Sequence, residues 1–236
     1  MARILAERVT AEIGDDVCVA GPDGRASSAA QRRFESLAKD APREVWFAAL
    51  HDAIEAHYLA EPGNPYRESG RSSGAARWEE TRACIAEAVD REGDFLDAGC
   101  ANGLLLETLA GWCAEKGIPI RPHGIDFVAA LVELARARHP EHAGSFEVAN
   151  AFTWQPRRRY DFVRASLECV QERDRPEFVR RLLEHAVAPE GRLIVCHYPG
   201  AGEPLIDVGA YLAECGYAVV GRASAANVSL AWIDKR

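Results

Sequence analysis

Short apolar runs alternate with longer amphipathic segments from residue 94 to the end of this 236-residue chain. The runs have the length of buried strands, and the segments between them repeat apolar residues with the period of a helix. Strands and helices that alternate in this way form βαβ units, which build a mostly parallel sheet with right-handed crossovers. The expected strands cover residues 94–98, 118–126, 145–151, 160–167, 191–198, 217–224 and 227–234, and the expected helices cover 104–117, 127–139, 176–187 and 207–216. No helix fits between the last two strands, so they should pair antiparallel at one edge of the sheet.

The first ninety residues have a different pattern. Helical periodicity is visible over residues 2–13, 28–39, 42–60 and 75–90. We therefore expect an N-terminal helical cap over residues 1–90 and a sheet domain over residues 91–236. The expected fold class is α/β, a doubly wound, Rossmann-like sheet of seven strands that is mostly parallel and has an antiparallel last strand.

The segment EPGNPYRESGRSSG, residues 61–74, lies between the last two expected cap helices. Its Gly, Pro and Ser content is typical of a linker. Tyr66 and Arg67 are unusual inside a plain linker, and loops often carry binding residues. Both interpretations, a linker and a functional loop, fit the sequence.

Composition argues against several classes of protein. The formal net charge is −8, whereas nucleic-acid affinity depends on Lys and Arg that neutralise phosphates, so no nucleic-acid partner is expected. No apolar stretch approaches eighteen residues, and the N-terminus carries several acidic residues, so neither a membrane span nor a secretory signal is expected. The seven cysteines are never closer than thirteen positions apart, which fits neither a disulfide framework nor a zinc motif. We expect a cytoplasmic protein without a metal.

The stretch DFLDAGCANGLLLETL, residues 94–109, ends a strand and opens a helix through a glycine turn. Gly99 lets the backbone leave the strand sharply, and Gly103 lets a ligand or the helix come close. Ligands of open parallel sheets bind at such turns, where the helix start offers unpaired N–H groups. A dinucleotide would need G-x-G-x-x-G, but Ala101 stands at the middle glycine. Asp97 suits an ammonium group better than a pyrophosphate, which favours a nucleoside with an amino-acid tail.

This stretch resembles motif I of class I S-adenosylmethionine-dependent methyltransferases, in which an apolar run, an acid and a small residue precede G-C-G-x-G. It departs from the family pattern at Ala101, which narrows the backbone options of the turn. The resemblance extends over roughly residues 90–236. GIDFVAALVELARAR is similar to the family's second-strand motif, VANAF to the turn after its third strand, YDFVRASLECV to its fourth strand, and LLEHAVAPEGRLIVCHY to the entry of its fifth strand. The resemblance implies that S-adenosylmethionine is the cofactor.

The resemblance also implies a role for individual residues. Asp126 would accept hydrogen bonds from both ribose hydroxyls, although a helix N-cap is the alternative role. Phe127 would cover one face of the adenine, or belong only to the core. Asn150, with the backbone of Ala151 and Phe152, would lie near the adenine edge. The expected cofactor contacts also include Tyr66, Arg67, Asp97, Gly99, Cys100, Ala101, Asn102, Gly103 and Ala165.

The methionine part of the cofactor needs partners for an ammonium and for a carboxylate. The carbonyls of Gly99 and Ala165 and the side chain of Asp97 would face the ammonium. The sheet motifs supply no cation for the carboxylate. In many such methyltransferases an Arg of an N-terminal segment that folds over the cofactor meets this carboxylate, and here NPYRESG offers Arg67 beside Tyr66. A lid of this kind also excludes water.

Three residues near the strand ends are candidates for a general base. Glu168 follows the fourth strand, and His197 and Tyr198 end the fifth. A general base contributes when the acceptor carries a proton that must leave. A structural strand-end histidine is the alternative role for His197.

The expected acceptor is a small molecule, either a metabolite or a natural-product intermediate, methylated on O, N or C by in-line displacement. The [D/N]-P-P-[Y/F] tetrad of enzymes that methylate DNA bases or glutamine has no counterpart in RASLECV. Two other classes stay open at this point. One is an NAD-dependent oxidoreductase on a related sheet, and the other is a methyltransferase-like protein that binds the cofactor but acts as a regulator.

Overall fold

A single seven-stranded sheet organises the chain, in the order β3-β2-β1-β4-β5-β7-β6. The computed structural model describes residues 29–70, 74–199 and 203–236, and the expected helix over residues 2–13 lies outside them. The strands are β1 (Gly93–Ala98), β2 (Ile120–Asp126), β3 (Phe146–Val148), β4 (Tyr160–Ser166), β5 (Val187–His197), β6 (Val219–Ala225) and β7 (Val228–Asp234). The first five strands pair in parallel, and β7 runs antiparallel to both β5 and β6. The expected fold, with the two last strands paired at one edge, is confirmed.

Two apolar layers bury the sheet on both faces. On one face lie α4 (Gly74–Arg82), the 3-10 helix η2 (Ala83–Ala88), α5 (Leu104–Glu115) and α6 (Ala129–Arg138), which share a core with Phe95 and Phe162. On the other face lie α7 (Arg175–Arg181), the π-helical turn η6 (Leu182–Ala186) and α8 (Val208–Glu214). All six residues of β1 are buried, including Asp94 and Asp97, as expected for a central strand covered on both faces. None of the helices in the described ranges is long and apolar enough to cross a membrane.

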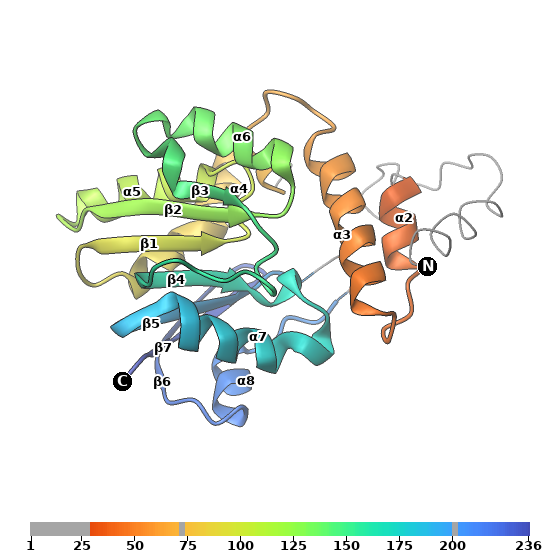
Figure 1. Cartoon of the computed structure of the whole chain (residues 1–236). Helices are drawn as coiled ribbons and strands as arrows, with labels where there is room; N and C mark the ends of the chain where they lie inside the picture. Colours follow the sequence, from red (N-terminus) through yellow and green to blue (C-terminus); the bar gives the residue numbers. More distant parts are fainter. Residues whose placement is uncertain (1–28, 71–73, 200–202) are drawn as a thin grey trace.

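The carboxyl ends of the parallel strands define one edge of the molecule. The arrowheads of β1 and β2 point toward α3 (Arg43–Tyr58) in Figure 1. The chain passes from β1 to β2 on one side and places β4 on the other, so the strand order reverses between β1 and β4. Open α/β sheets bind their ligands in the crevice at such a switch point.

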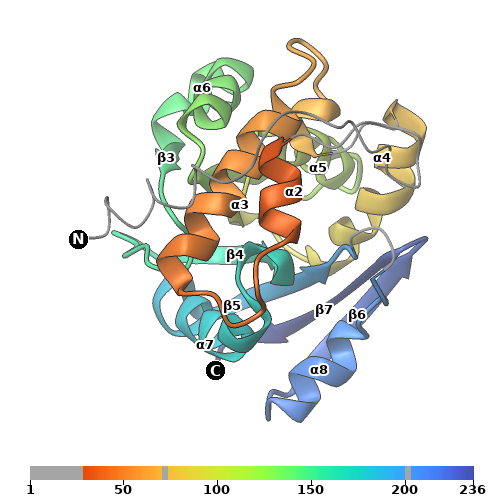
Figure 2. The ribbon, with the colours of Figure 1, turned by 90° about the vertical axis from the view of Figure 1, so that its right-hand side faces the viewer.

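The N-terminal helices lie across this edge. α2 (Ala29–Glu35) and α3 pack against each other and stand in front of β4 and β5 in Figure 2. α3 buries Ala49 and Ala53. A short 3-10 helix, η1 (Arg67–Ser69), follows on the way to α4. The cap therefore reaches the switch point from outside the sheet.

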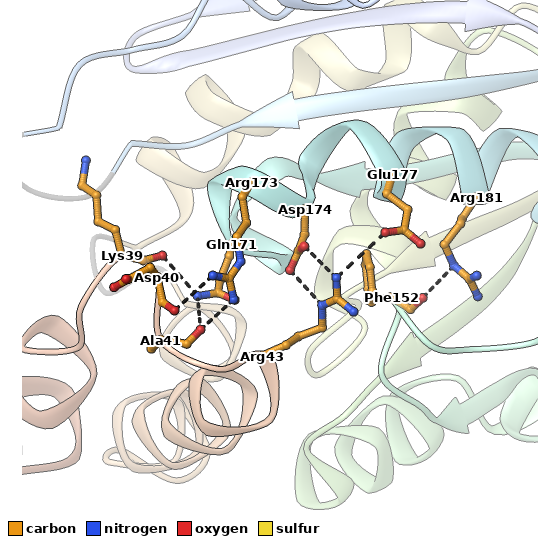
Figure 3. A network of polar contacts seen from close by, with 10 residues as sticks. All are labelled: Lys39, Asp40, Ala41, Arg43, Phe152, Gln171, Arg173, Asp174, Glu177 and Arg181. Carbon is orange, nitrogen blue, oxygen red and sulfur yellow. Dashed lines mark hydrogen bonds and ion pairs between the residues drawn. The ribbon is translucent and has the colours of Figure 1, made fainter.

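A polar network, which we call the latch, fastens the start of α3 to the segment before α7 (Figure 3). Arg43 donates from Nε to Asp174 Oδ2 at 3.0 Å and from its second guanidinium nitrogen to Oδ1 at 2.8 Å. The same guanidinium lies 4.4 Å from the centre of the Phe152 ring. Arg173 and Gln171 donate to the backbone carbonyls of Lys39, Asp40 and Ala41. The Arg43 hydrogen bond lowers the pKa of Asp174, so the pair is ionised at neutral pH.

Arg43→Ala is expected to loosen the cap without unfolding the sheet. The Arg43 side chain is 41 % exposed, so the ion pair contributes only about 0.5–1 kcal/mol after solvent screening. Amide hydrogen exchange in α3 should accelerate roughly two- to fivefold. Arg180→Ala is the matched control, because it removes an exposed ion pair to Glu184 that does not touch the cap. Equal exchange rates in α3 of both variants would show that the latch does not hold the cap.

Candidate functional site

Three left-handed residues shape the turn after β1. Gly99, Ala101 and Gly103 have φ angles of 89°, 47° and 76°. Glycine adopts this region freely, whereas an L-residue loses about 1–2 kcal/mol in it. Ala101 therefore adopts, at some cost, a conformation that glycine adopts more readily. The amides of Gly99 and Cys100 both donate to the carbonyl of Ile125, which fixes the turn to the end of β2.

Asp126, the last residue of β2, holds the turn from the other side. Its Oδ2 accepts from the amide of Ala101 and its Oδ1 from the amide of Val128, both at 2.9 Å. The residue is 7 % exposed, and burial raises the pKa of its carboxyl to about 6. Val128, and not Asp126, is the N-cap residue of α6. Each carboxylate oxygen has a second lone pair, so Asp126 can accept from two further hydroxyl groups.

Two buried guanidinium groups lie next to the acid that precedes the turn. Arg164 on β4 pairs with Asp97 on β1 at 2.9 Å, and the residues are direct neighbours across the two strands. Tyr198 lies between this pair and Arg82, whose guanidinium is 3.8 Å from the ring centre. Arg82 is 8 % exposed and, within the described residues, has no carboxylate within ion-pair distance. The Nε of Arg164 is buried without a hydrogen-bond partner in the same ranges.

The cap loop is docked onto the turn. Asn102 is fully buried, and its Nδ2 donates to the carbonyl of Pro65 at 2.9 Å and to Glu68 Oε2 at 3.2 Å. The other oxygen of Glu68 accepts from the amide of Gly63 at 2.7 Å. Residues 61–70 are therefore a folded part of the site, which excludes the interpretation as a plain linker for this part of the segment.

The two loop residues expected to bind the cofactor have contacts of their own. Arg67 donates from Nε to the carbonyl of His57 at 3.0 Å, and its guanidinium lies 3.3 Å from the Nδ1 of the same histidine. Tyr66 packs edge-on against Trp78, with 6.2 Å between the ring centres. Trp78 in turn contacts the guanidinium of Arg82. Arg67 thus holds the loop to the end of α3. Tyr66 packs on Trp78, which in turn lies next to Arg82.

The end of α3 reaches Asp126. Burial and the charge of Asp126 raise the pKa of Tyr58 to about 12. Phe127 belongs to the same small apolar cluster as Ile54 and Tyr58 of the cap, and His51 meets its ring edge-on at 5.5 Å. The face of Phe127 expected to cover adenine therefore lies under α3.

The loop after β3 has its backbone ordered by Asn150. The Oδ1 of Asn150 accepts from the amide of Phe152 at 2.9 Å, and the carbonyl of Phe152 accepts from Arg181. The Phe152 ring is buried under the latch and its amide is engaged, so this residue offers a ligand only the second lone pair of its carbonyl. Ala151 is partly buried beside it, and Ala165 stands opposite Ala98 near the end of β4.

The three candidate bases lie together after β4 and β5. Glu168, in the 3-10 helix η4 (Leu167–Cys169), accepts through Oε1 from the amide of Tyr198 at 2.9 Å. The Nε2 of His197 is 3.3 Å from the same oxygen. The Tyr198 hydroxyl is buried and has no partner within the described part of the chain. No three His, Cys, Asp or Glu residues of the described ranges lie close enough together to hold a metal ion.

Residues 95–191 match the family model of a methyltransferase domain. This part of the chain is thus similar to methyltransferase domains, which confirms the expected resemblance. Solved methyltransferases of this fold hold S-adenosylhomocysteine, which indicates S-adenosylmethionine as the cofactor. No curated protein matches the chain.

Solved methyltransferases share the fold. A 1,6-didemethyltoxoflavin-N1-methyltransferase from Burkholderia thailandensis has a TM-score of 0.58 at 16 % identity, covering 83 % of this chain and 91 % of that one. The N-methyltransferase NodS from Bradyrhizobium japonicum WM9 has a TM-score of 0.54 at 14 % identity, covering 78 % and 97 %. A methyltransferase from Aquifex aeolicus has a TM-score of 0.52 at 17 % identity, covering 69 % and 94 %. At these identities the likeness shows the fold.

Sequence reasoning missed four side chains of the site, namely Tyr58, Glu68, Arg82 and Arg164. The sequence could have identified Arg164, because a charged residue inside the apolar run of a central strand is buried and requires a partner of opposite charge. The positions of Tyr58, Glu68 and Arg82 depend on how the cap and α4 pack against the sheet. The local sequence pattern does not predict this packing.

Gly103→Ala is expected to destabilise the protein more than Gly117→Ala. Both glycines are left-handed, with φ angles of 76° and 72°. A Cβ at Gly103 would lie 3.0 Å from the His139 ring and 3.2 Å from the Ala135 Cβ, whereas a Cβ at Gly117 would meet nothing within 4 Å. Gly117→Ala should lower the free energy of unfolding by about 1–2 kcal/mol, and Gly103→Ala by roughly 1 kcal/mol more. Urea denaturation measures both, and equal losses would mean that the turn tolerates a side chain there.

Proposed function

We propose that this chain transfers a methyl group from S-adenosylmethionine to a small molecule, either a metabolite or a natural-product intermediate, on O, N or C. The main support is the unit formed by the glycine turn and Asp126, which joins backbone N–H groups to a buried carboxylate at the switch point of the sheet. One fold relative, the Burkholderia N1-methyltransferase, was solved with bound 1,6-didemethyltoxoflavin and S-adenosylhomocysteine. A negatively charged chain with a cap over the site suits a small acceptor better than a nucleic acid.

The described residues fit the nucleoside part of this cofactor. Asp126 has lone pairs left for two ribose hydroxyls. Asn150 orders the loop at which the adenine edge is expected, and Phe127 lies beside it under the cap. The Gly99 and Gly103 positions leave no room for a side chain, since a Cβ there would crowd Cys169 and His139.

The amino-acid tail of the cofactor has two candidate partners for its carboxylate. Arg67 is the candidate from the sequence, but its guanidinium is already engaged by His57. Arg82 is buried, and among the residues that the structure describes it donates only to the carbonyl and hydroxyl of Thr81, both at 3.3 Å. Its charge acts on Asp97, the expected partner of the ammonium group. An amino group near Asp97 and a carboxylate near Arg82 would match the two charges of the tail, so we favour Arg82.

The chain contributes mainly by holding the reactants. When bound, the cofactor supplies an electrophilic methyl group. The turn, Asp126 and the arginines orient it, and the cap excludes water. Holding the acceptor in a near-attack geometry is worth about 7–11 kcal/mol of the barrier. We therefore regard residues 1–90 as a cap that completes the site and residues 91–236 as the cofactor-binding domain.

Calorimetric titration tests the proposed function. The protein should bind S-adenosylmethionine and S-adenosylhomocysteine and not NAD. Asp126→Ala should weaken S-adenosylhomocysteine roughly 10- to 100-fold, because hydrogen bonds to a charged group are lost. A protein that binds NAD but neither S-adenosylmethionine nor S-adenosylhomocysteine would contradict the proposal.

The same titration has an expected pH dependence. Ribose hydroxyls donate to the ionised carboxylate, so binding favours the form of Asp126 that exists above its pKa of about 6. Affinity for S-adenosylhomocysteine should rise as the pH increases through that value and then level off. Asp126→Asn should bind weakly with no such rise, and a rise that survives in this variant would assign it to another group.

Arg82 and Arg67 can be distinguished with a truncated ligand. 5′-Methylthioadenosine lacks the amino-acid tail, so its affinity reports on the nucleoside site alone. Arg82→Met should reduce the preference for S-adenosylhomocysteine over methylthioadenosine roughly tenfold and leave methylthioadenosine binding unchanged. Arg67→Met is the matched variant and should keep the preference. The opposite result would return the carboxylate contact to Arg67.

A further inference from the structure

Among the described residues, one oxygen of the Glu168 carboxylate has a hydrogen-bond donor and the other has none. Oε1 accepts from the amide of Tyr198 at 2.9 Å and lies 3.3 Å from His197 Nε2. Oε2 is shielded from solvent and has no hydrogen-bond partner within residues 29–70, 74–199 and 203–236. A buried carboxylate oxygen without a partner is costly, which calls for a function.

The hydrogen-bond partners of His197 fix its tautomer. Its Nδ1 accepts from the amide of Ile206 at 3.2 Å, so this nitrogen carries no proton. The proton is therefore on Nε2, which faces Glu168 Oε1. The side chain is 3 % exposed, and burial lowers the pKa of His197. A neutral imidazole thus lies with its Nε2 3.3 Å from the carboxylate and does not compete with it for a proton.

The groups around Glu168 explain its proton affinity. Burial raises the pKa of Glu168, while the amide of Tyr198, the hydroxyl of Ser166 and the charge of Arg164 oppose the rise in part. Tyr58 of α3 and Cys169 also face it, and burial raises the pKa of both, so they carry no charge at neutral pH. The result is a carboxylate that is a stronger base than that of a solvated glutamate.

Glu168 lies at the switch point itself. The segment η4 packs on the glycine turn, since a Cβ at Gly99 would be 3.1 Å from Cys169 Sγ. The Glu168 side chain keeps 32 % of its surface exposed, so a small molecule can approach it. Tyr198 is less suited to take a proton, because its ring lies between Arg82 and Arg164 and burial raises the pKa of its hydroxyl.

We propose that Glu168 is the general base of methyl transfer, that His197 is its positioning residue, and that the acceptor is an O–H or N–H group which loses its proton. The acceptor's electron pair forms the new bond to the methyl carbon, the pair of the broken C–S bond stays on sulfur, and the proton goes to the Glu168 carboxylate. This inference rests on the proposed function and narrows it to acceptors that need a base. A tertiary amine or a thioether has no proton to lose and would leave Glu168 without a role.

Sinefungin provides a test that needs no acceptor. This analogue has an amine-bearing carbon in place of the methylated sulfur, so its ammonium group takes the place of the transferred methyl. The wild-type protein should bind sinefungin more tightly than S-adenosylhomocysteine. Glu168→Gln should reduce that preference about tenfold and change S-adenosylhomocysteine affinity less than about twofold. Glu172→Gln, which removes an exposed acid from the next turn of chain, is the control and should change neither affinity.

The pH dependence tests the role of His197. The preference for sinefungin should disappear as the pH falls through the pKa of Glu168, because a protonated carboxyl no longer attracts the ammonium. His197→Leu removes the polar N–H group that lies nearest to Glu168 Oε1 and should move this midpoint to higher pH. His197→Gln keeps a donor at the position of Nε2 and should leave the midpoint near that of the wild type. An unchanged midpoint in His197→Leu would overturn the positioning role.

The results separate the inference from the proposed function. If S-adenosylhomocysteine binds and Glu168→Gln keeps the full preference for sinefungin, Glu168 is not the base. If the wild-type protein binds neither ligand, the proposed function itself fails, and the inference fails with it. Unchanged S-adenosylhomocysteine affinity in Glu168→Gln also shows that this variant folds.

Discussion

The contact between the turn after β1 and the end of β2 is the constraint on which the rest of the site depends. Three left-handed residues in five positions turn the chain, and the amides of this turn donate to Ile125 and Asp126 of the neighbouring strand. The turn and the acid are therefore one rigid unit and not two separate motifs. Their relative position is set by the β1–β2 register, so the apolar layers that fix this register also fix the cofactor site.

Buried charge is concentrated at the same edge of the sheet. Asp97, Arg164 and Arg82 are each less than a tenth exposed, and Glu168 lies close to them. Removing such groups from water costs several kcal/mol each, and apolar residues of similar volume would often give a more stable protein. Perturbed titratable groups cluster at functional sites because binding and proton transfer require them there. Part of this cost falls at the switch point, and buried Asp94 and Arg192 add to it elsewhere in the sheet, while the two apolar layers carry the stability.

The sequence predicted the sheet well because its signals are local. The apolar run of β5 and the helical period of α5 each lie within one segment, and the glycine turn identifies both its own structure and the family. The side chains that complete the site depend on contacts between distant segments. Arg164 meets Asp97 only because β4 pairs with β1, and Glu68 meets Asn102 only because the loop folds back over 34 residues of chain. Tyr66 and Arg67 indicated this loop, but Pro65 and Glu68 on either side of them make its hydrogen bonds to the turn, by accepting from Asn102.

The cap and the cofactor site are coupled through shared residues. The latch residue Arg43 lies on the Phe152 ring, whose backbone belongs to the expected adenine loop, and Tyr58 of the same helix lies near Asp126. Asn102 bonds the cap loop with one end of its amide and the first amide of α5 with the other. A ligand that orders the turn and the adenine loop therefore stabilises the surfaces on which the cap docks. By thermodynamic linkage the closed cap must raise the affinity for that ligand by the same factor by which the ligand favours closure. Residues of the latch, far from the reacting atoms, thus contribute to cofactor affinity through the cap that they hold.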